Sequence, residues 1–179
     1  MIVIVGESGA GKTTLAQMLV KARPEYERVV TCTTRPMRAN EIDGVDYVFT
    51  TEEAFDRAIQ DGLFIEHAKY RGWQYGTCKF SCVDNSVVVL TPAGLRALVR
   101  SGIDVVSIYI DVDRRSRLIK MLSRGDDVDE ACRRSCSDVG QFDGISHEVN
   151  LVISNHEYQK SPELVLEEAL KYINEVIEC

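Results

Sequence analysis

Unbroken apolar runs along the chain predict strands that are buried on both faces. The first five residues and the run Val87-Val88-Val89-Leu90 contain no polar side chain. A strand without a polar face suits a parallel sheet that is covered on both sides, because neither face of such a sheet meets water. The expected core strands are Ile2–Val5, Arg28–Thr31, Ser86–Thr91, Val105–Ile110 and Asn150–Ser154.

Apolar residues three and four positions apart predict helices between these strands. Leu15, Met18 and Leu19 have this spacing. Pro92 and Pro162 suit the first turn of a helix, where a missing N–H is not needed. The expected helices are Thr13–Lys21, Pro92–Arg100, Arg114–Ser123, Val128–Val139 and Pro162–Val176. Strands that alternate with helices indicate an α/β fold, with a parallel sheet core and helices on both of its faces.

The segment between residues 34 and 77 interrupts this alternation. It reads as short strands and one helix, Glu52–Gln60, with aromatic residues among them. Residues Asp46–Thr50 alternate polar and apolar side chains, as a half-exposed antiparallel strand does. We therefore expect a small mixed insert that stands off the parallel sheet. The charged segment Arg124–Asp138 is a second candidate for a mobile piece.

Composition and charge restrict the possible partners. The length of 179 residues favours one domain, which can bury a full core without disulfides or metals. No apolar run approaches the ~20 residues of a membrane span, and no signal peptide precedes the first strand, so we expect a cytoplasmic protein without a membrane partner. The net charge of −7 argues against nucleic-acid binding. Arg114, Arg115 and Arg117 are expected on an exposed helix face, and the oligomeric state is left open between monomer and homodimer.

The six cysteines are expected to be free thiols, as is usual in a cytosolic protein. They are Cys32, Cys78, Cys82, Cys132, Cys136 and Cys179. Four of them form two C-x3-C pairs, so a zinc tetrad is conceivable. The spacing departs from the C-x2-C and C-x4-C pairs of structural zinc sites, which makes free thiols the preferred interpretation.

The residues from Gly6 to Thr13 fit the phosphate-binding pattern G-x-x-x-x-G-K-[ST]. A predicted strand precedes this stretch and a predicted helix follows it, which is the context that the motif requires. The alternative, a chance glycine turn between strand and helix, is disfavoured by four fixed positions in that context. The motif indicates a nucleoside triphosphate without saying which one, or what accepts the phosphoryl group.

The chemistry of this loop follows from its residue types. Gly6, Gly9 and Gly11 let backbone N–H groups turn inward around a phosphate, and the next helix points its positive end at the same anion. Lys12 can reach the β- and γ-phosphates, and the Thr13 hydroxyl can coordinate Mg²⁺. The expected triphosphate-binding residues are Gly6, Glu7, Ser8, Gly9, Ala10, Gly11, Lys12, Thr13 and Thr14.

The insert carries side chains that suit a second phosphate and a base. Arg35 and Arg38 follow a core strand and could present two guanidinium groups to one phosphate. Tyr47 and Tyr75 each offer a hydroxyl, although either could instead be a packing aromatic. Glu66 is a carboxylate among apolar residues and could accept two N–H bonds from the N1–N2 edge of guanine, a donor pair that adenine lacks. The alternative for Glu66 is a surface carboxylate.

These residues fall into motifs that resemble the guanylate kinase family, whose members phosphorylate GMP with ATP. Four motifs occur in the family order: Thr-Thr-Arg-x-x-Arg-x-x-Glu (33–41), Gly-x-Asp-Tyr-x-Phe (44–49), Phe-Ile-Glu (64–66) and Gly-x-x-Tyr-Gly-Thr (72–77). Together with the glycine loop they cover residues 1–77 densely. The second half matches more thinly, through Arg124-Gly125, the arginine pair that follows and Val152-Ile153-Ser154-Asn155.

The resemblance implies a reaction and a division of the chain. The reaction is transfer of the ATP γ-phosphoryl group to GMP or dGMP with Mg²⁺, which gives ADP and, from GMP, GDP. The implied core comprises residues 1–33, 78–121 and 139–179. The implied acceptor-binding insert comprises residues 34–77, and the implied helical lid comprises residues 122–138.

The resemblance also implies roles for individual residues. Lys12, Arg124 and Arg134 would be catalytic, with Arg133 an alternative to Arg134 because the register after Gly125 allows either. Thr13 would serve the metal. The implied GMP-binding residues are Thr31, Arg35, Arg38, Glu41, Tyr47, Glu66, Tyr75 and Thr77.

One departure from the family pattern concerns the end of the third core strand. The family usually carries acidic residues there, and alignment on Gly94 puts Val89 and Thr91 in their place. The Thr91 hydroxyl, or Asp111 at the end of the next strand, could contribute instead. Three alternatives therefore stay open: a related kinase acting on ribose 1,5-bisphosphate, a non-catalytic guanylate-kinase-like domain that binds nucleotide or protein, and a nucleotide-dependent switch without a small-molecule acceptor.

Overall fold

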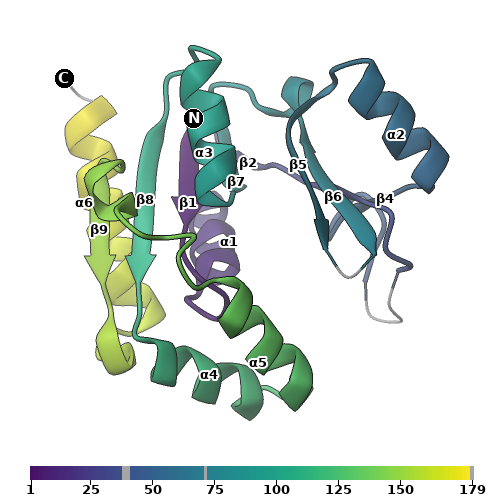
Figure 1. The fold of residues 1–179 in the computed structure, drawn as a ribbon. Helices are drawn as coiled ribbons and strands as arrows, with labels where there is room; N and C mark the ends of the chain where they lie inside the picture. Colours follow the sequence, from purple (N-terminus) through teal and green to yellow (C-terminus); the bar gives the residue numbers. More distant parts are fainter. Residues whose placement is uncertain (38–40, 71, 178–179) are drawn as a thin grey trace.

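The computed structural model describes residues 1–37, 41–70 and 72–177. Its core is a five-stranded sheet in the order β2-β7-β1-β8-β9, in which every neighbouring pair is parallel (Figure 1). The predicted α/β fold with a parallel core is therefore confirmed. The strands are β1 (Ile2–Val5), β2 (Glu27–Arg28), β7 (Ser86–Val89), β8 (Val106–Asp111) and β9 (Leu151–Ser154).

Helices cover both faces of this sheet. Ile2 and Ile4 pack in the cluster formed with α1 and α6 on one face, whereas Val3 and Val5 pack in the cluster formed with α3 on the other. All four side chains are buried, which explains why β1 has no polar position. The helices are α1 (Lys12–Ala22), α3 (Pro92–Arg100) and α6 (Pro162–Ile177).

A second, smaller sheet stands beside the first (Figure 1). Its order is β4-β3-β6-β5, and β6 pairs antiparallel with both β3 and β5. Helix α2 packs on this sheet through Phe55, whose ring stacks on that of Phe64 with centroids 4.4 Å apart. The predicted mixed insert is thus present. Its elements are β3 (Cys32–Thr33), β4 (Val48–Phe49), α2 (Glu52–Gln60), β5 (Phe64–Tyr70) and β6 (Trp73–Cys78).

Two strand predictions at the start of the insert are wrong. Of the expected strand Arg28–Thr31, only Arg28 lies in a strand, because β2 ends there and β3 of the other sheet begins at Cys32. The expected antiparallel strand Asp46–Thr50 is reduced to β4, which runs parallel to β3. The loop after β3 carries the chain back to the start of that strand, so β4 runs in the same direction.

Two further helices lie at the carboxyl edge of the parallel sheet, below it in Figure 1. They are α4 (Arg114–Ser123) and α5 (Val128–Ser137), and each begins after an aspartate whose carboxylate accepts from an N–H of the first turn. Helix α5 is two residues shorter than predicted. Gly140 turns the chain with a φ of 78°, and Asp138 bonds to the glycine loop instead of extending the helix. Single 3-10 turns are η1 (Lys79–Ser81), η2 (Ile145–His147) and η3 (His156–Tyr158).

Candidate functional site

The glycine loop connects β1, at the centre of the sheet, to α1. Gly9 and Gly11 have φ angles of 87° and 96°, which glycine adopts without strain. A Cβ on Gly9 would lie 3.0 Å from the carbonyl oxygen of Arg117, so a larger residue would press against α4. Gly11 is the N-cap of α1, and Thr13 and Thr14 are exposed in the first turn of that helix. The N–H groups of this turn have no partner within the helix, which suits an anion.

Lys12 lies against the same loop and is surrounded by charges. Its Nζ donates to the carbonyl oxygen of Glu7 at 2.9 Å. Desolvation lowers the pKa of Lys12 to about 8; the carboxylates of Asp138 and Glu7 act in the opposite direction. The guanidinium groups of Arg117 and Arg134 lower the pKa further. Two carboxylates and two guanidinium groups therefore influence the pKa of this one amine in opposite directions.

The insert brings together four of the side chains predicted to hold the acceptor. Arg35 donates to Glu41 Oε1 at 2.6 Å, and its Cζ atom lies 5.4 Å from the centroid of the Tyr47 ring. The rings of Tyr47 and Tyr75 meet edge to face, with centroids 6.0 Å apart. Glu41 and Tyr75 both raise the pKa of Arg35, with Glu41 the stronger influence. Arg38, from the same predicted set, lies outside the described residues.

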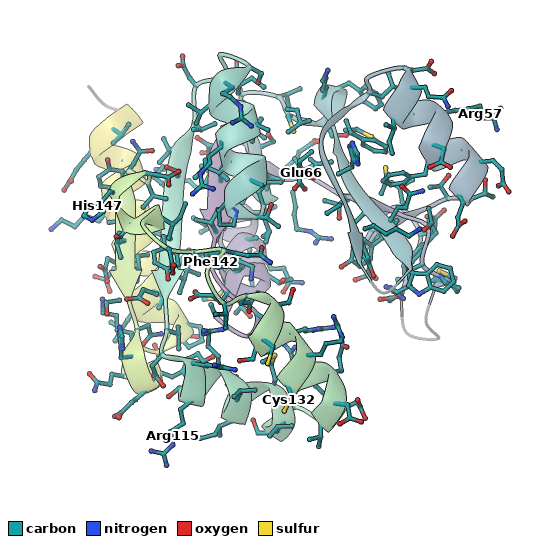
Figure 2. All side chains as sticks on the ribbon, in the orientation of Figure 1. Arg57, Glu66, Arg115, Cys132, Phe142 and His147 are labelled. Carbon is teal, nitrogen blue, oxygen red and sulfur yellow. The ribbon has the colours of Figure 1, made fainter. Side chains whose placement is uncertain are left out.

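Glu66 points from β5 toward α3, between the insert and the core (Figure 2). Its carboxylate accepts from the hydroxyl of Thr77 at 3.1 Å and from that of Thr91 at 3.2 Å. A Cβ on Gly94 would lie 2.8 Å from Glu66 Oε2, so only glycine leaves room for the carboxylate there. Burial raises the pKa of Glu66, and the two threonine hydroxyls partly offset this. Thr31 joins the sheet through its carbonyl oxygen, and its guanine-reading role stays a prediction.

Arg133 and Arg134 both donate to the carboxylate of Glu130 on helix α5, Arg133 at 2.8 Å and Arg134 at 2.7 Å. The positive charge of Arg134 lowers the pKa of Lys12 in the glycine loop and of Tyr47 in the insert, behind desolvation as the main influence on each. Arg134 is therefore within electrostatic reach of both clusters, and its choice over Arg133 stays a prediction.

Arg124 follows α4 and lies further out. It forms a two-pronged pair with Asp126, with distances of 2.9 and 2.5 Å, and half of its side chain is exposed. Asp126 also lies 3.8 Å from Arg134. One carboxylate thus holds the two predicted catalytic arginines near each other, while Arg134 alone of the two influences Lys12.

Arg117 is a residue that the sequence analysis placed wrongly. It was expected on an exposed face with Arg114 and Arg115, and Arg115 does point into solvent (Figure 2). Arg117 is only 5% exposed and lies between Glu7 and Asp138, 3.5 Å from each carboxylate. It also donates to the carbonyl oxygens of Val112 and Ser8.

Asp138 completes this cluster beneath the glycine loop. It accepts from the N–H of Ser8 at 2.8 Å, so the residue after α5 is bonded directly to the loop. Tyr109 donates to Glu7 from the adjoining strand at 3.1 Å. A usable signal in the sequence was the position of Arg117 four residues before Met121, on the buried face of α4.

Arg117→Met is expected to lower the free energy of unfolding by about 3 kcal/mol, because it leaves two partly buried carboxylates without their buried cation. At this chain length each kcal/mol corresponds to about 2–4 °C in the thermal midpoint, which calorimetry measures. The control Arg115→Met, on the exposed face of the same helix, should stay within about 0.5 kcal/mol of the wild type. Equal midpoints for the two variants would contradict a structural role for the cluster.

The ends of β7 and β8 carry the two residues, Thr91 and Asp111, that could stand in for the expected acids. Val89 is the last residue of β7, and Thr91 is the N-cap of α3, where it accepts from the N–H of Gly94 at 3.1 Å. Asp111, at the end of β8, lies 3.0 Å from His156 Nε2. Both residues that could have stood in for the acids therefore already have protein partners.

A phosphate loop at the centre of a parallel sheet, with a mixed insert beside it, defines a P-loop α/β protein. The model of the family described as "Guanylate kinase" matches residues 1–178. The chain belongs to the guanylate kinase family.

Individual relatives agree with this assignment. A guanylate kinase of Thermosynechococcus vestitus is 33% identical, over 90% of this chain and 88% of its own length. A guanylate kinase of Rubrobacter xylanophilus is 29% identical, over 93% and 91% respectively. In fold, the chain is similar to the crystal structure of guanylate kinase from Anaplasma phagocytophilum, with a TM-score of 0.71 and 22% identity over 97% of this chain and 84% of the other. The resemblance deduced from the motifs is confirmed.

The described part of the chain offers neither a membrane-spanning helix nor a cluster of metal ligands. None of the helices within residues 1–37, 41–70 and 72–177 is long and apolar enough to cross a membrane. In the same part of the chain, no three His, Cys, Asp or Glu side chains gather as a metal site. The two C-x3-C pairs lie on different elements: Cys78 ends β6 and Cys82 follows η1, whereas Cys132 and Cys136 are on α5.

Proposed function

We propose that this chain transfers the γ-phosphoryl group of ATP to GMP or dGMP, giving ADP and the corresponding diphosphate. The observation that carries the proposal is that the fold sets a glycine loop beside an insert in which Arg35, Tyr47 and Tyr75 gather. A donor phosphate would lie on the loop and an acceptor phosphate on the insert. The charge of Arg134 lowers the pKa of Lys12 and of Tyr47, behind desolvation as the main influence on each, which suits a guanidinium group that serves both phosphates. Family membership and the names of the relatives support ATP and GMP as the substrates.

The glycine loop and the first turn of α1 would bind the phosphates of ATP. Lys12 would exchange its bond to Glu7 for the β- and γ-phosphates. Kinases of this family use ATP with a divalent metal, and we propose Mg²⁺ with Thr13 as its protein ligand. One exposed hydroxyl group as protein ligand fits an ion that keeps several waters and takes its other oxygens from phosphate. The bound ion would offset the charge of the β- and γ-phosphates.

The acceptor side uses the cluster on the insert. Arg35 would turn from Glu41 toward the phosphate of GMP, with the hydroxyls of Tyr47 and Tyr75 and the neighbouring Arg38 as further donors. No general base is required, because the attacking atom is already an anionic phosphate oxygen. The tasks that remain are alignment and neutralisation of charge.

Glu66 would read the base. In the ligand-free protein its two oxygens accept from Thr77 and Thr91. Guanine would offer its N1–H and N2–H groups to the same carboxylate, while adenine would leave a buried charge unpaired. We also propose residues 34–77 as the acceptor-binding unit and residues 122–138 as the lid. Arg124 and Arg134 would arrive with the lid to stabilise the transferring group and exclude water, in a reaction placed in the cytoplasm.

The proposal is tested by identifying both products. The purified protein is incubated with ATP, Mg²⁺ and GMP, and the nucleotides are separated by ion-exchange chromatography. ADP and GDP should appear in equal amounts, and neither should form when GMP is left out. ADP and inorganic phosphate without GDP would instead indicate a nucleotide-dependent switch. Tight ATP and GMP binding without any product would indicate a binding domain.

Glu66→Gln is expected to raise the KM for GMP about 10–100-fold with little change in the KM for ATP. The amide presents one acceptor and one donor to two N–H groups, so one charge-assisted bond is lost. Steady-state kinetics with each substrate varied in turn measures both constants. A matched control is Glu163→Gln, an exposed carboxylate in the first turn of α6. An unchanged KM for GMP in Glu66→Gln would remove this residue from base recognition.

The same variant is expected to stabilise the ligand-free protein at neutral pH. Burial raises the pKa of Glu66 in the folded protein above its value in the unfolded chain. As the pH rises, this carboxyl group therefore ionises first in the unfolded chain, and the folded wild type loses stability. The glutamine variant has no carboxyl group at this position and keeps that stability. Below about pH 4 the carboxyl group is protonated in both states, and the difference should shrink. Thermal midpoints measured at both pH values check this. A difference that is independent of pH would contradict burial as its source.

A further inference from the structure

Three cysteines gather where the chain passes between the parallel sheet and the insert. Cys32 is the first residue of β3, Cys78 is the last residue of β6, and Cys82 follows the turn η1. The Sγ atoms of Cys32 and Cys78 lie 3.5 Å apart, and the Cys82 thiol donates to the carbonyl oxygen of Cys78 at 3.5 Å. All three are half-buried free thiols.

Cys32 and Cys78 lie where the insert joins the core, so a bond between them would restrict the movement of the insert. The chain enters the insert through residues 29–31 and leaves it through residues 79–85, so Cys32 and Cys78 mark the two ends of the connection. In the β3–β6 ladder Cys32 is opposite Gly76, which makes Cys78 its diagonal neighbour on the same face. A disulfide needs a sulfur–sulfur distance of about 2.05 Å, which the pair can approach by side-chain rotation and a small shift of the strand ends.

We propose that Cys32 and Cys78 form a reversible disulfide under oxidising conditions, and that this bond weakens acceptor binding by fixing the junction between core and insert. Hydrogen peroxide is the oxidant. The sulfur of one of the two cysteines attacks one peroxide oxygen, the O–O bond breaks, and a sulfenic acid and water result. The sulfur of the other cysteine then attacks the sulfenic sulfur, the S–S bond forms and a second water leaves. Two thiols are oxidised by two electrons, and one hydrogen peroxide is reduced to two waters.

The surroundings of the thiols make the first step slow at neutral pH. Burial, and then the contact with Cys78, raise the pKa of Cys32, so little thiolate is present and an excess of peroxide is needed. Burial likewise raises the pKa of Cys82 to about 11. In a reducing compartment cellular thiols keep the pair reduced, so the disulfide forms only transiently, when peroxide is present.

The consequence for acceptor binding follows from the neighbours of the pair and rests on the function proposed above. Thr31 and Thr77 adjoin Cys32 and Cys78, and Thr77 donates to the Glu66 carboxylate at 3.1 Å. Drawing the two strand ends together displaces Thr77 from Glu66. It also restricts the motion of the insert that closure over two substrates requires. The glycine loop belongs to the other sheet, so binding of ATP should be unaffected.

The disulfide is tested first without reference to activity. The full-length protein is treated with hydrogen peroxide, free thiols are alkylated, and tryptic peptides are analysed by mass spectrometry without reduction. Cleavage after Lys79 separates Cys78 from Cys82, so the mass of a linked pair distinguishes Cys32–Cys78 from Cys78–Cys82. The proposal expects the Cys32–Cys78 pair. A Cys78–Cys82 pair, or sulfinic acid with no linked peptide, would overturn it.

Kinetics then tests the consequence. Oxidised wild type should show a KM for GMP about tenfold higher at an unchanged KM for ATP, and dithiothreitol should restore it. Cys32→Ser should be insensitive to peroxide. The control Cys82→Ser removes the third thiol of the cluster and leaves the proposed pair, so it should respond like the wild type, as should Cys132→Ser on α5 (Figure 2) in its sensitivity to peroxide alone. A mapped Cys32–Cys78 bond with an unchanged KM for GMP would refute the regulatory claim. Absence of GMP-dependent turnover in the reduced protein would refute the proposed function and leave the mapped bond standing.

Discussion

Replacing Lys12 with alanine is expected to lower kcat about 10³-fold. The ammonium group lies beside the glycine loop with its Nζ 2.9 Å from the Glu7 carbonyl, and it is already desolvated. In such surroundings its charge acts strongly on the oxygens that gain charge in the transition state. Single-turnover measurements with saturating ATP and GMP isolate this step from product release.

The control for this variant is Lys21→Ala. Lys21 lies in the last turn of the same helix and is exposed, so its loss should leave kcat unchanged within about twofold. A Lys12→Ala protein that keeps kcat within threefold of the wild type would show that the loop does not serve phosphoryl transfer in the way proposed.

Arg134→Ala is the second variant with a large expected effect, a fall in kcat of about 10²–10³-fold. Arg134 is within electrostatic reach of both Lys12 and Tyr47, so its charge is placed to act on the group that passes between the two substrates. Because this interaction develops in the transition state, the KM values for ATP and GMP should change little.

Arg133→Ala provides a matched comparison, since Arg133 donates to the same Glu130 carboxylate. Each single variant leaves one arginine on that carboxylate, so damage to the fold of α5 should be similar in the two. The proposal requires Arg133→Ala to keep kcat within about threefold of the wild type. If Arg133→Ala were the slower enzyme, the assignment of the lid arginine would be reversed.

Local signals in the sequence predicted the helices and the central strands well. The bounds of β1, α2, α3 and α4 agree with the expected ranges, because cap residues such as Thr51, Thr91 and Asp113 mark where these helices begin. The strand β4 was predicted in the wrong direction. Its pairing depends on the path of the long loop after β3, and no local pattern of polar and apolar residues encodes that path.

In the candidate site, too, residues in local motifs were predicted, and residues placed by long-range contacts were missed. Arg35, Tyr47 and Tyr75 belong to motifs, and the structure gathers them. Arg117 and Asp138 were missed, because they reach the loop only through contacts between residues more than a hundred positions apart. Their burial depends on how α4 and α5 pack at the carboxyl edge of the sheet, which a single sequence does not specify.

The end of β7 carries Val89 and Thr91 where the family resemblance led us to expect acidic residues. Thr91 caps α3 and donates to Glu66, so in the proposed function a residue at the expected metal-organising position would support base recognition instead. Charge at the donor site is then balanced by the cluster of Glu7, Arg117 and Asp138 around Lys12. Phosphoryl transfer in this chain is expected to proceed without acids on β7.

Acceptor-dependent release of ADP tests the central claim most directly. The protein is assayed with ATP and Mg²⁺ against GMP, dGMP, AMP, UMP, CMP and ribose 1,5-bisphosphate, each over a range of concentrations. The account predicts release with GMP and dGMP, and a kcat/KM for GMP at least about 10³-fold above that for AMP. Equal use of GMP and AMP, or release with ribose 1,5-bisphosphate alone, would contradict it.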